Sequence, residues 1–130
     1  MAQTCVLDAS AVIRLICADP TAAPWTPILA EAPLVMAPEL MLTEVTNTLW
    51  KLQRADRLGN HDPQRLLINA RELVDEVVAD RHLHAEALAL ACHLDHPAYD
   101  CLYLALARRE AASLITADRR LRQLSERVLP

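Results

Sequence analysis

Four acidic residues spread along the chain have the types and surroundings that could bind a metal ion. They are Asp8, Glu44, Asp100 and Asp118. Carboxylate oxygens are the ligands that hard divalent cations such as Mg²⁺ or Mn²⁺ prefer. Such an ion can lower the pKa of a bound water, and a pair of ions can also stabilise the leaving oxygen of an in-line displacement. Hydrolysis of a phosphodiester is therefore the chemistry that we expect if the four acids converge.

Glu44 has few simple explanations, because its neighbours along the chain are apolar. It follows the apolar residues 40–42 and precedes Val45 within a predicted helix. A glutamate on a largely apolar helix side is costly unless it is protonated, paired or bound to a metal ion. The alternative is that Glu44 points to solvent and pairs with Lys51 two turns away, and we judge that alternative weaker.

Asp100 lies in the first turn of a stretch, residues 99–107, that is apolar nearly all round. This pattern is typical of a buried helix. An acid in the first turn can complement the helix dipole. The dipole explains the position of Asp100, but it does not explain why the neighbours are two tyrosines and an otherwise dry helix.

Asp8 and Asp118 each follow a predicted strand, at residues 4–7 and 114–116. Aspartate is a common residue at helix N-termini, so each of them alone could be a simple cap. If the two strands are parallel, however, both acids reach the same edge of the sheet. Ligands of open α/β folds bind at that edge, beyond the carboxyl ends of the strands.

The elements that must position these acids alternate between strand and helix. We predict strands at 4–7, 34–36, 74–78 and 114–116, a further edge strand at 128–129, and helices at 9–17, 24–32, 39–58, 62–73, 82–94, 99–110 and from 118 onward. Residues 74–78 could instead be the tail of the helix before them. Such alternation favours an α/β fold with a mostly parallel sheet and helices on both faces. Gly59 is the only glycine, so a glycine-rich phosphate loop is excluded.

Length and composition fit one domain over residues 1–130, with 53% hydrophobic residues. The net charge of −4 argues against simple electrostatic binding of nucleic acid. From residue 108 onward, however, the sequence contains six arginines and three acidic residues, which gives this segment a net charge of +3. Within this segment Arg108, Arg119 and Arg120 could contact RNA phosphates, and solvated helix faces are an equally good interpretation.

We expect no signal peptide and no membrane span. The N-terminus lacks the pattern of a signal peptide, and no apolar run approaches the ~18–20 residues of a membrane span. The four cysteines show no C-x-x-C spacing, so we expect reduced, mostly buried thiols and a cytoplasmic location. Two histidine pairs, His82 with His84 and His93 with His96, lack a convincing zinc spacing, and we expect exposed histidines near helix ends.

At this point the sequence resembles the PIN-domain nucleases, and within them the VapC-type toxins of prokaryotic toxin–antitoxin pairs. The matching segments are VLDASAVIRL, PELMLTEVTNTLWKL, AYDCLYLALA and LITADRRL. They lie in family order and spacing over essentially the whole chain. The resemblance implies that Asp8, Glu44, Asp100 and Asp118 form the metal-binding and catalytic set, supported by Ser10, Asn47 and Thr116.

The resemblance also implies a fold, an activity and partners. The fold would be a three-layer α/β/α sandwich around a four- to five-stranded sheet. The activity would be that of a Mg²⁺-dependent endoribonuclease, and the partners a cognate antitoxin and a second copy of the chain. The alternative is a catalytically silent module that binds RNA or a partner. The presence of all four acids argues against it, because a degenerate copy would be expected to lose one.

Overall fold

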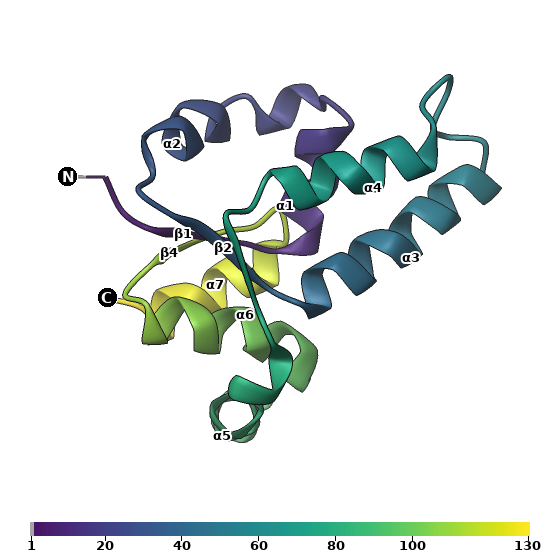
Figure 1. The fold of residues 1–130 in the computed structure, drawn as a ribbon. Helices are drawn as coiled ribbons and strands as arrows, with labels where there is room; N and C mark the ends of the chain where they lie inside the picture. The colour runs from purple at the N-terminus through teal and green to yellow at the C-terminus, as the bar shows by residue number, and fades with distance from the viewer. Residues whose placement is uncertain (1) are drawn as a thin grey trace.

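In the computed structural model, which describes residues 2–130, the centre is a four-stranded sheet with the strand order β3-β2-β1-β4 (Figure 1). The strands are β1 (Cys5–Leu7), β2 (Val35–Pro38), β3 (Glu76–Val78) and β4 (Ser113–Ile115). All pairings are parallel, and Val6 lies opposite both Met36 and Leu114. The carboxyl ends of the strands therefore meet at one edge.

Helices cover both faces of this sheet. They are α1 (Ala9–Ile16), α2 (Trp25–Glu31), α3 (Leu40–Arg54), α4 (Pro63–Glu72), α5 (His84–Leu94), α6 (Ala98–Arg109) and α7 (Arg119–Val128), with short 3₁₀ turns at Pro20–Ala22 and Asp80–His82. In Figure 1, α1, α2 and α4 lie above the sheet, and α5, α6 and α7 lie below it. The predicted three-layer α/β/α sandwich is confirmed.

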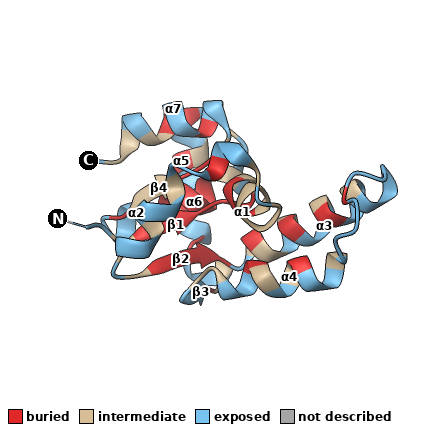
Figure 2. Ribbon diagram, turned by 90° about the horizontal axis from the view of Figure 1, so that it is seen from above, coloured by how far each residue is buried: buried red, intermediate tan, exposed pale blue. Residues whose placement is uncertain are grey.

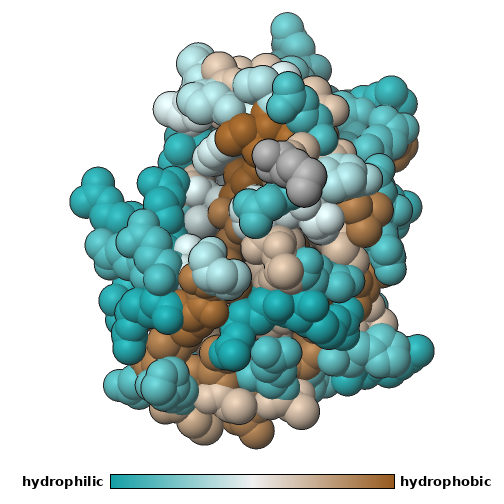
Figure 3. Space-filling view, turned by 90° about the vertical axis from the view of Figure 1, so that its left-hand side faces the viewer, coloured by the Kyte–Doolittle hydropathy of each residue, from teal (hydrophilic) through white to brown (hydrophobic). Residues whose placement is uncertain are grey.

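Helix α6 forms the centre of the core. It packs against β1, β2 and β4, and every residue from Cys101 to Ala107 is buried (Figure 2). In contrast to this apolar core, the molecular surface at the amino ends of the strands mixes hydrophobic and hydrophilic side chains (Figure 3). An apolar helix in the middle of the molecule gives Asp100, at its first turn, a fixed support.

Helix α3 ends earlier than we predicted. The predicted stop was Gly59, but the helix ends at Arg54, and Asp56 already has a φ of 55°. Aspartate tolerates this left-handed conformation better than most residues. The chain therefore turns twice, at Asp56 and again at Gly59, and it buries Leu58 between the two turns.

Two further sequence predictions need correction. The edge strand at 128–129 is wrong, because Val128 is the last residue of α7 and the Leu129 N–H donates to the Ser125 carbonyl at 2.8 Å. The helix predicted from residue 82 is divided: a 3₁₀ turn ends at His82, and α5 begins only at His84. The buried Leu83 separates the two pieces and anchors the join in the core.

Two further findings concern the lengths of the helices and the cysteines. No helix within residues 2–130 is both long and apolar enough to cross a membrane. The cysteines of this range are free; Cys5 and Cys101 are buried as predicted, whereas Cys92 is exposed.

Candidate active site

Asp8 is the most buried acid of the predicted set, with 4% of its surface exposed. It follows β1 directly and forms the N-cap of α1. Its Oδ1 accepts hydrogen bonds from the Ala11 N–H at 2.9 Å and the Ser10 hydroxyl at 2.8 Å. Its Oδ2 accepts one from the Thr116 hydroxyl at 2.5 Å. Burial nevertheless raises the pKa of Asp8, and the charge of Asp100 contributes to the rise.

Thr116, just beyond the end of β4, links Asp8 to Asp118. Its hydroxyl oxygen accepts a hydrogen bond from the Asp118 N–H at 2.9 Å while donating to Asp8. Ser10 adds a second link, because its hydroxyl accepts from the Ala117 N–H at 3.0 Å. Asp118 itself is exposed, and its Oδ1 caps α7 by accepting from the Leu121 N–H at 3.0 Å. The ends of β1 and β4 are therefore joined by side chains that we singled out from the sequence.

Glu44 lies on α3 and faces α6. Its Oε1 accepts a hydrogen bond from the Tyr103 hydroxyl at 2.5 Å, and no ion pair with Lys51 exists within residues 2–130. Burial raises the pKa of Glu44, and the charges of Asp100, Asp8 and Asp80 raise it further. Glu44 is therefore close enough to both Asp8 and Asp100 for their charges to repel.

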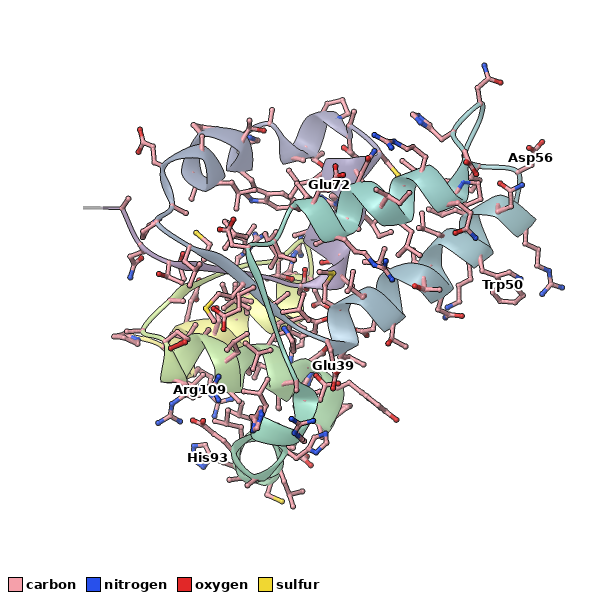
Figure 4. The ribbon with its side chains drawn as sticks, viewed as in Figure 1. Glu39, Trp50, Asp56, Glu72, His93 and Arg109 are labelled. Atoms are coloured by element: carbon pink, nitrogen blue, oxygen red, sulfur yellow. The ribbon has the colours of Figure 1, made fainter. Side chains whose placement is uncertain are left out.

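Asp100 is held by a histidine. The His96 Nε2 lies 2.6 Å from its Oδ2, and the two side chains are 14% and 31% exposed, respectively. Our expectation of an exposed histidine was wrong for His96, because the turn before α6 brings it onto Asp100. His93, by contrast, is exposed on α5 as expected (Figure 4).

The donor set at this edge fits a hydrated divalent cation. Within the described part of the chain, no three His, Cys, Asp or Glu side chains converge tightly enough to form a complete ligand group. Mg²⁺ does not require one, because it usually keeps several waters and binds through one or two carboxylates. Three oxygens here, Oε2 of Glu44, Oδ1 of Asp100 and Oδ2 of Asp118, accept no hydrogen bond from residues 2–130.

The remaining predicted residues differ in position. Asn47 is exposed on α3, one turn after Glu44. Arg119 and Arg120 are exposed in the first turn of α7, directly after Asp118. Arg108 lies eight residues after Asp100 on α6, about 12 Å along the helix axis. Its Nε is 3.8 Å from the Glu86 carboxylate.

Sequence reasoning missed three contributors at this edge. The contact of Tyr103 with Glu44 could have been predicted from the sequence. A buried tyrosine hydroxyl needs a hydrogen-bond partner, and Glu44 was an acid on an apolar helix side without an assigned partner. Arg122 donates from its guanidinium to the Thr116 carbonyl at 2.8 Å, although we weighed it only as part of a basic segment. Asp80 accepts a hydrogen bond from the Leu40 N–H at the start of α3. No sequence pattern indicated this contact, because it depends on how the end of β3 lies beside the start of α3.

Residues 5–127 match the family model of the PIN domain. The chain belongs to the PIN-domain family. Among curated proteins, Ribonuclease VapC3 of Pyrobaculum aerophilum is 31% identical over 120 residues, which cover 89% of this chain and 90% of that protein. The prediction of a VapC-type PIN domain is therefore confirmed.

Solved structures give the same fold for this PIN domain. PAE2754 from Pyrobaculum aerophilum superposes with a TM-score of 0.71 at 26% identity, covering 99% of this chain and 84% of that one. VapC20 of Mycobacterium tuberculosis, described as a toxin that cleaves the sarcin-ricin loop, has a TM-score of 0.67 at 18% identity over 92% and 93% of the two chains. The second likeness shows a shared fold.

Proposed function

We propose that this PIN domain is a divalent-metal-dependent endoribonuclease that acts as the toxin of a toxin–antitoxin pair. The observation that carries the proposal is the gathering of buried Asp8 and half-buried Glu44 and Asp100 at one edge of the sheet, where burial first and neighbouring acid charges second raise the pKa of Asp8 and Glu44. A bound cation would offset that cost. The relatives support the RNA substrate and the toxin role, since one is named a ribonuclease and another a toxin.

The four acids take different roles in this proposal. Together they would hold a hydrated Mg²⁺ or Mn²⁺, in part through its waters, and Asp118, the exposed member, would also face the side where water and RNA enter. When bound, the cation activates water and polarises the phosphodiester. Ser10, Thr116 and the Ala11 N–H fix the carboxylate of Asp8. The Tyr103 hydroxyl fixes Glu44 and leaves its Oε2 available to the ion.

Arginines beside the acids would hold the substrate. Arg119 and Arg120 are exposed next to Asp118, so their guanidinium groups can reach phosphates flanking the cleaved bond. We do not include Arg108 in this group, because it lies at the far end of α6 and its Nε is 3.8 Å from the Glu86 carboxylate. Local positive charge next to the acids would overcome the negative net charge of the whole chain.

A toxin in the cytoplasm needs surface for an antitoxin and, by family resemblance, for a second copy of itself. Two exposed apolar areas could serve. One is a groove between α3 and α4 beside Trp50, whose surface is 54% exposed and which points outward from α3 (Figure 4). The other surrounds Leu88 and Tyr99 on α5 and α6. Size-exclusion chromatography with light scattering would test whether the chain alone is a homodimer.

Cleavage of RNA by the purified protein tests the proposed activity. We expect cleavage with Mg²⁺ or Mn²⁺, loss of cleavage with EDTA, and loss with Asp8→Asn. Cleavage that survives both EDTA and Asp8→Asn would overturn the metal-nuclease proposal. No cleavage under any of these conditions would favour the silent binding module.

Expression in cells tests the toxin role. We expect growth arrest by the wild-type chain and relief of the arrest by Asp100→Asn, because the variant lacks one of the proposed metal ligands. Equal arrest by the wild type and the variant would contradict the toxin role.

A further inference from the structure

The turn between α5 and α6 fixes the position of the His96 backbone. Asp95 has a left-handed φ of 52°, and the N–H groups of both Asp95 and His96 donate to the Ala91 carbonyl. Pro97, the next residue, forms the N-cap of α6 with a φ of −53°. This double hydrogen bond is a common helix ending, and proline restricts the following backbone. The backbone of His96 is therefore held just before α6, within reach of the first turn of that helix.

The contact between His96 and Asp100 is short and sheltered. Nε2 and Oδ2 are 2.6 Å apart, and only 14% of the His96 side chain is exposed. An ionised carboxylate can only accept hydrogen bonds, so His96 Nε2 is the donor to the ionised form of Asp100. The bond occupies Oδ2, whereas Oδ1 accepts no hydrogen bond from residues 2–130.

We propose that His96 is a positioning residue for metal binding, which holds Asp100 through Oδ2 so that Oδ1 alone faces the cation. The inference rests on the proposed function of the acidic site. Mg²⁺ prefers oxygen ligands, so His96 stays outside the coordination sphere and acts through the carboxylate. Partners of this kind orient a metal ligand and raise its basicity. Tyr103 holds Glu44 in the same way, through one oxygen.

Binding of Mn²⁺ or Mg²⁺ to the full chain measures this role directly. His96→Ala should weaken the affinity for Mn²⁺ about 10- to 100-fold, the usual cost of losing such a partner. His96→Gln should restore most of it, because its amide nitrogen can occupy the position of Nε2. His96→Asn should not, since its amide overlays Nδ1 instead. His93→Ala is the matched control, because His93 is exposed on the neighbouring helix and should leave the affinity unchanged.

A double-mutant cycle shows whether His96 acts through Asp100. In an Asp100→Asn background, His96→Ala should cost little further affinity, because the carboxylate that it positions is gone. RNA cleavage by His96→Ala should recover at saturating Mn²⁺, so that the half-saturating metal concentration changes more than kcat does. The melting temperature of each metal-free variant reports whether that variant is folded. If His96→Ala does not fold, the comparison of His96→Gln with His96→Asn tests the role of the Nε2 donor instead.

The outcomes separate the two proposals. A wild-type chain that binds no Mn²⁺ and cleaves no RNA contradicts the proposed function itself. A wild type that binds and cleaves, beside a folded His96→Ala with unchanged Mn²⁺ affinity, overturns only the role of His96. Equal losses in His96→Gln and His96→Asn would also overturn it, because the Nε2 donor would then not be what matters.

Discussion

Among single residues, Asp8 and Glu44 carry a cost that a cation would remove. Burial raises the pKa of both carboxyls, and their neighbours' charges add to the rise. A raised carboxyl pKa means that the folded state binds protons more tightly than the unfolded state does. The folded state therefore loses stability as pH rises from about 4, the ordinary carboxyl value, through the raised pKa.

Removing one of these charges should stabilise the metal-free protein. Glu44→Gln keeps an oxygen for the Tyr103 hydroxyl but cannot ionise, so we expect its melting temperature at about pH 7.5 to rise by about 2–4 °C. RNA cleavage should fall to background. Glu72→Gln, an exposed position on α4 (Figure 4), is the control and should change neither quantity. A lower melting temperature for Glu44→Gln would contradict the repulsion.

The same repulsion predicts how pH changes the effect of metal. Mg²⁺ binds carboxylates only after they lose their protons, so it should raise the melting temperature strongly at about pH 8 and little at about pH 4. Thermal melts with and without Mg²⁺ across this range would measure the difference. A Mg²⁺ effect independent of pH would place the bound ion away from these acids.

The sequence pointed to the acids that lie at this edge of the sheet, but not to all of their hydrogen-bond partners. Asp8 and Asp118 could be placed together because parallel strands bring their carboxyl ends to one edge. His96 could not be linked to Asp100, because the link depends on the left-handed backbone of Asp95, which a sequence pattern does not reveal. Hydrogen-bond partners depend on such local geometry, whereas the convergence of the acids follows from topology.

At the scale of elements, the start of α3 is held by a segment forty residues away. The Asp80 Oδ1 accepts from the Leu40 N–H at 3.2 Å, and the Glu39 Oε1 accepts from the Asp80 N–H at 2.9 Å. The backbone N–H of Glu39 also donates to the Val78 carbonyl at 2.9 Å. Glu39 lies where α3 begins, next to the segment that leads into α5 (Figure 4). The end of β3 therefore fixes the helix that carries Glu44.

Asp80→Ala should destabilise the protein by about 0.5–2 kcal/mol, the usual cost of losing a helix cap. Asp80→Asn should retain most of the stability, because its amide oxygen can still accept from the Leu40 N–H. Urea unfolding of both variants would measure this difference. Equal stability of Asp80→Ala and the wild type would show that the contact contributes nothing.

Boundaries of elements were less predictable than their order. The sequence pattern placed the end of α3 at Gly59, because glycine is the usual residue in a left-handed turn. Asp56 takes that conformation first, and the buried Leu58 makes the earlier exit favourable. The packing of one leucine thus decided a boundary that local preferences alone assigned elsewhere.

For the whole molecule, the proposed function predicts that RNA is bound by the two exposed arginines that follow Asp118, Arg119 and Arg120. Replacing both Arg119 and Arg120 with alanine should raise the KM for RNA several-fold, with a smaller change in kcat and a shallower dependence on salt. Arg108→Ala is the matched control, since Arg108 pairs with Glu86 at the far end of α6. Cleavage rates at several salt concentrations would test this, and equal effects of both variants would contradict it.

Helix α6 has a consequence for how this protein is inactivated. The helix that carries Asp100 and Tyr103 also has every residue from Cys101 to Ala107 buried. Asp100 cannot move away from its neighbours without exposing that apolar surface to water. Heating should therefore abolish catalysis and the fold in a single step. A protease in the cell would then meet either the folded chain or a fully unfolded one, with no partly unfolded intermediate between them.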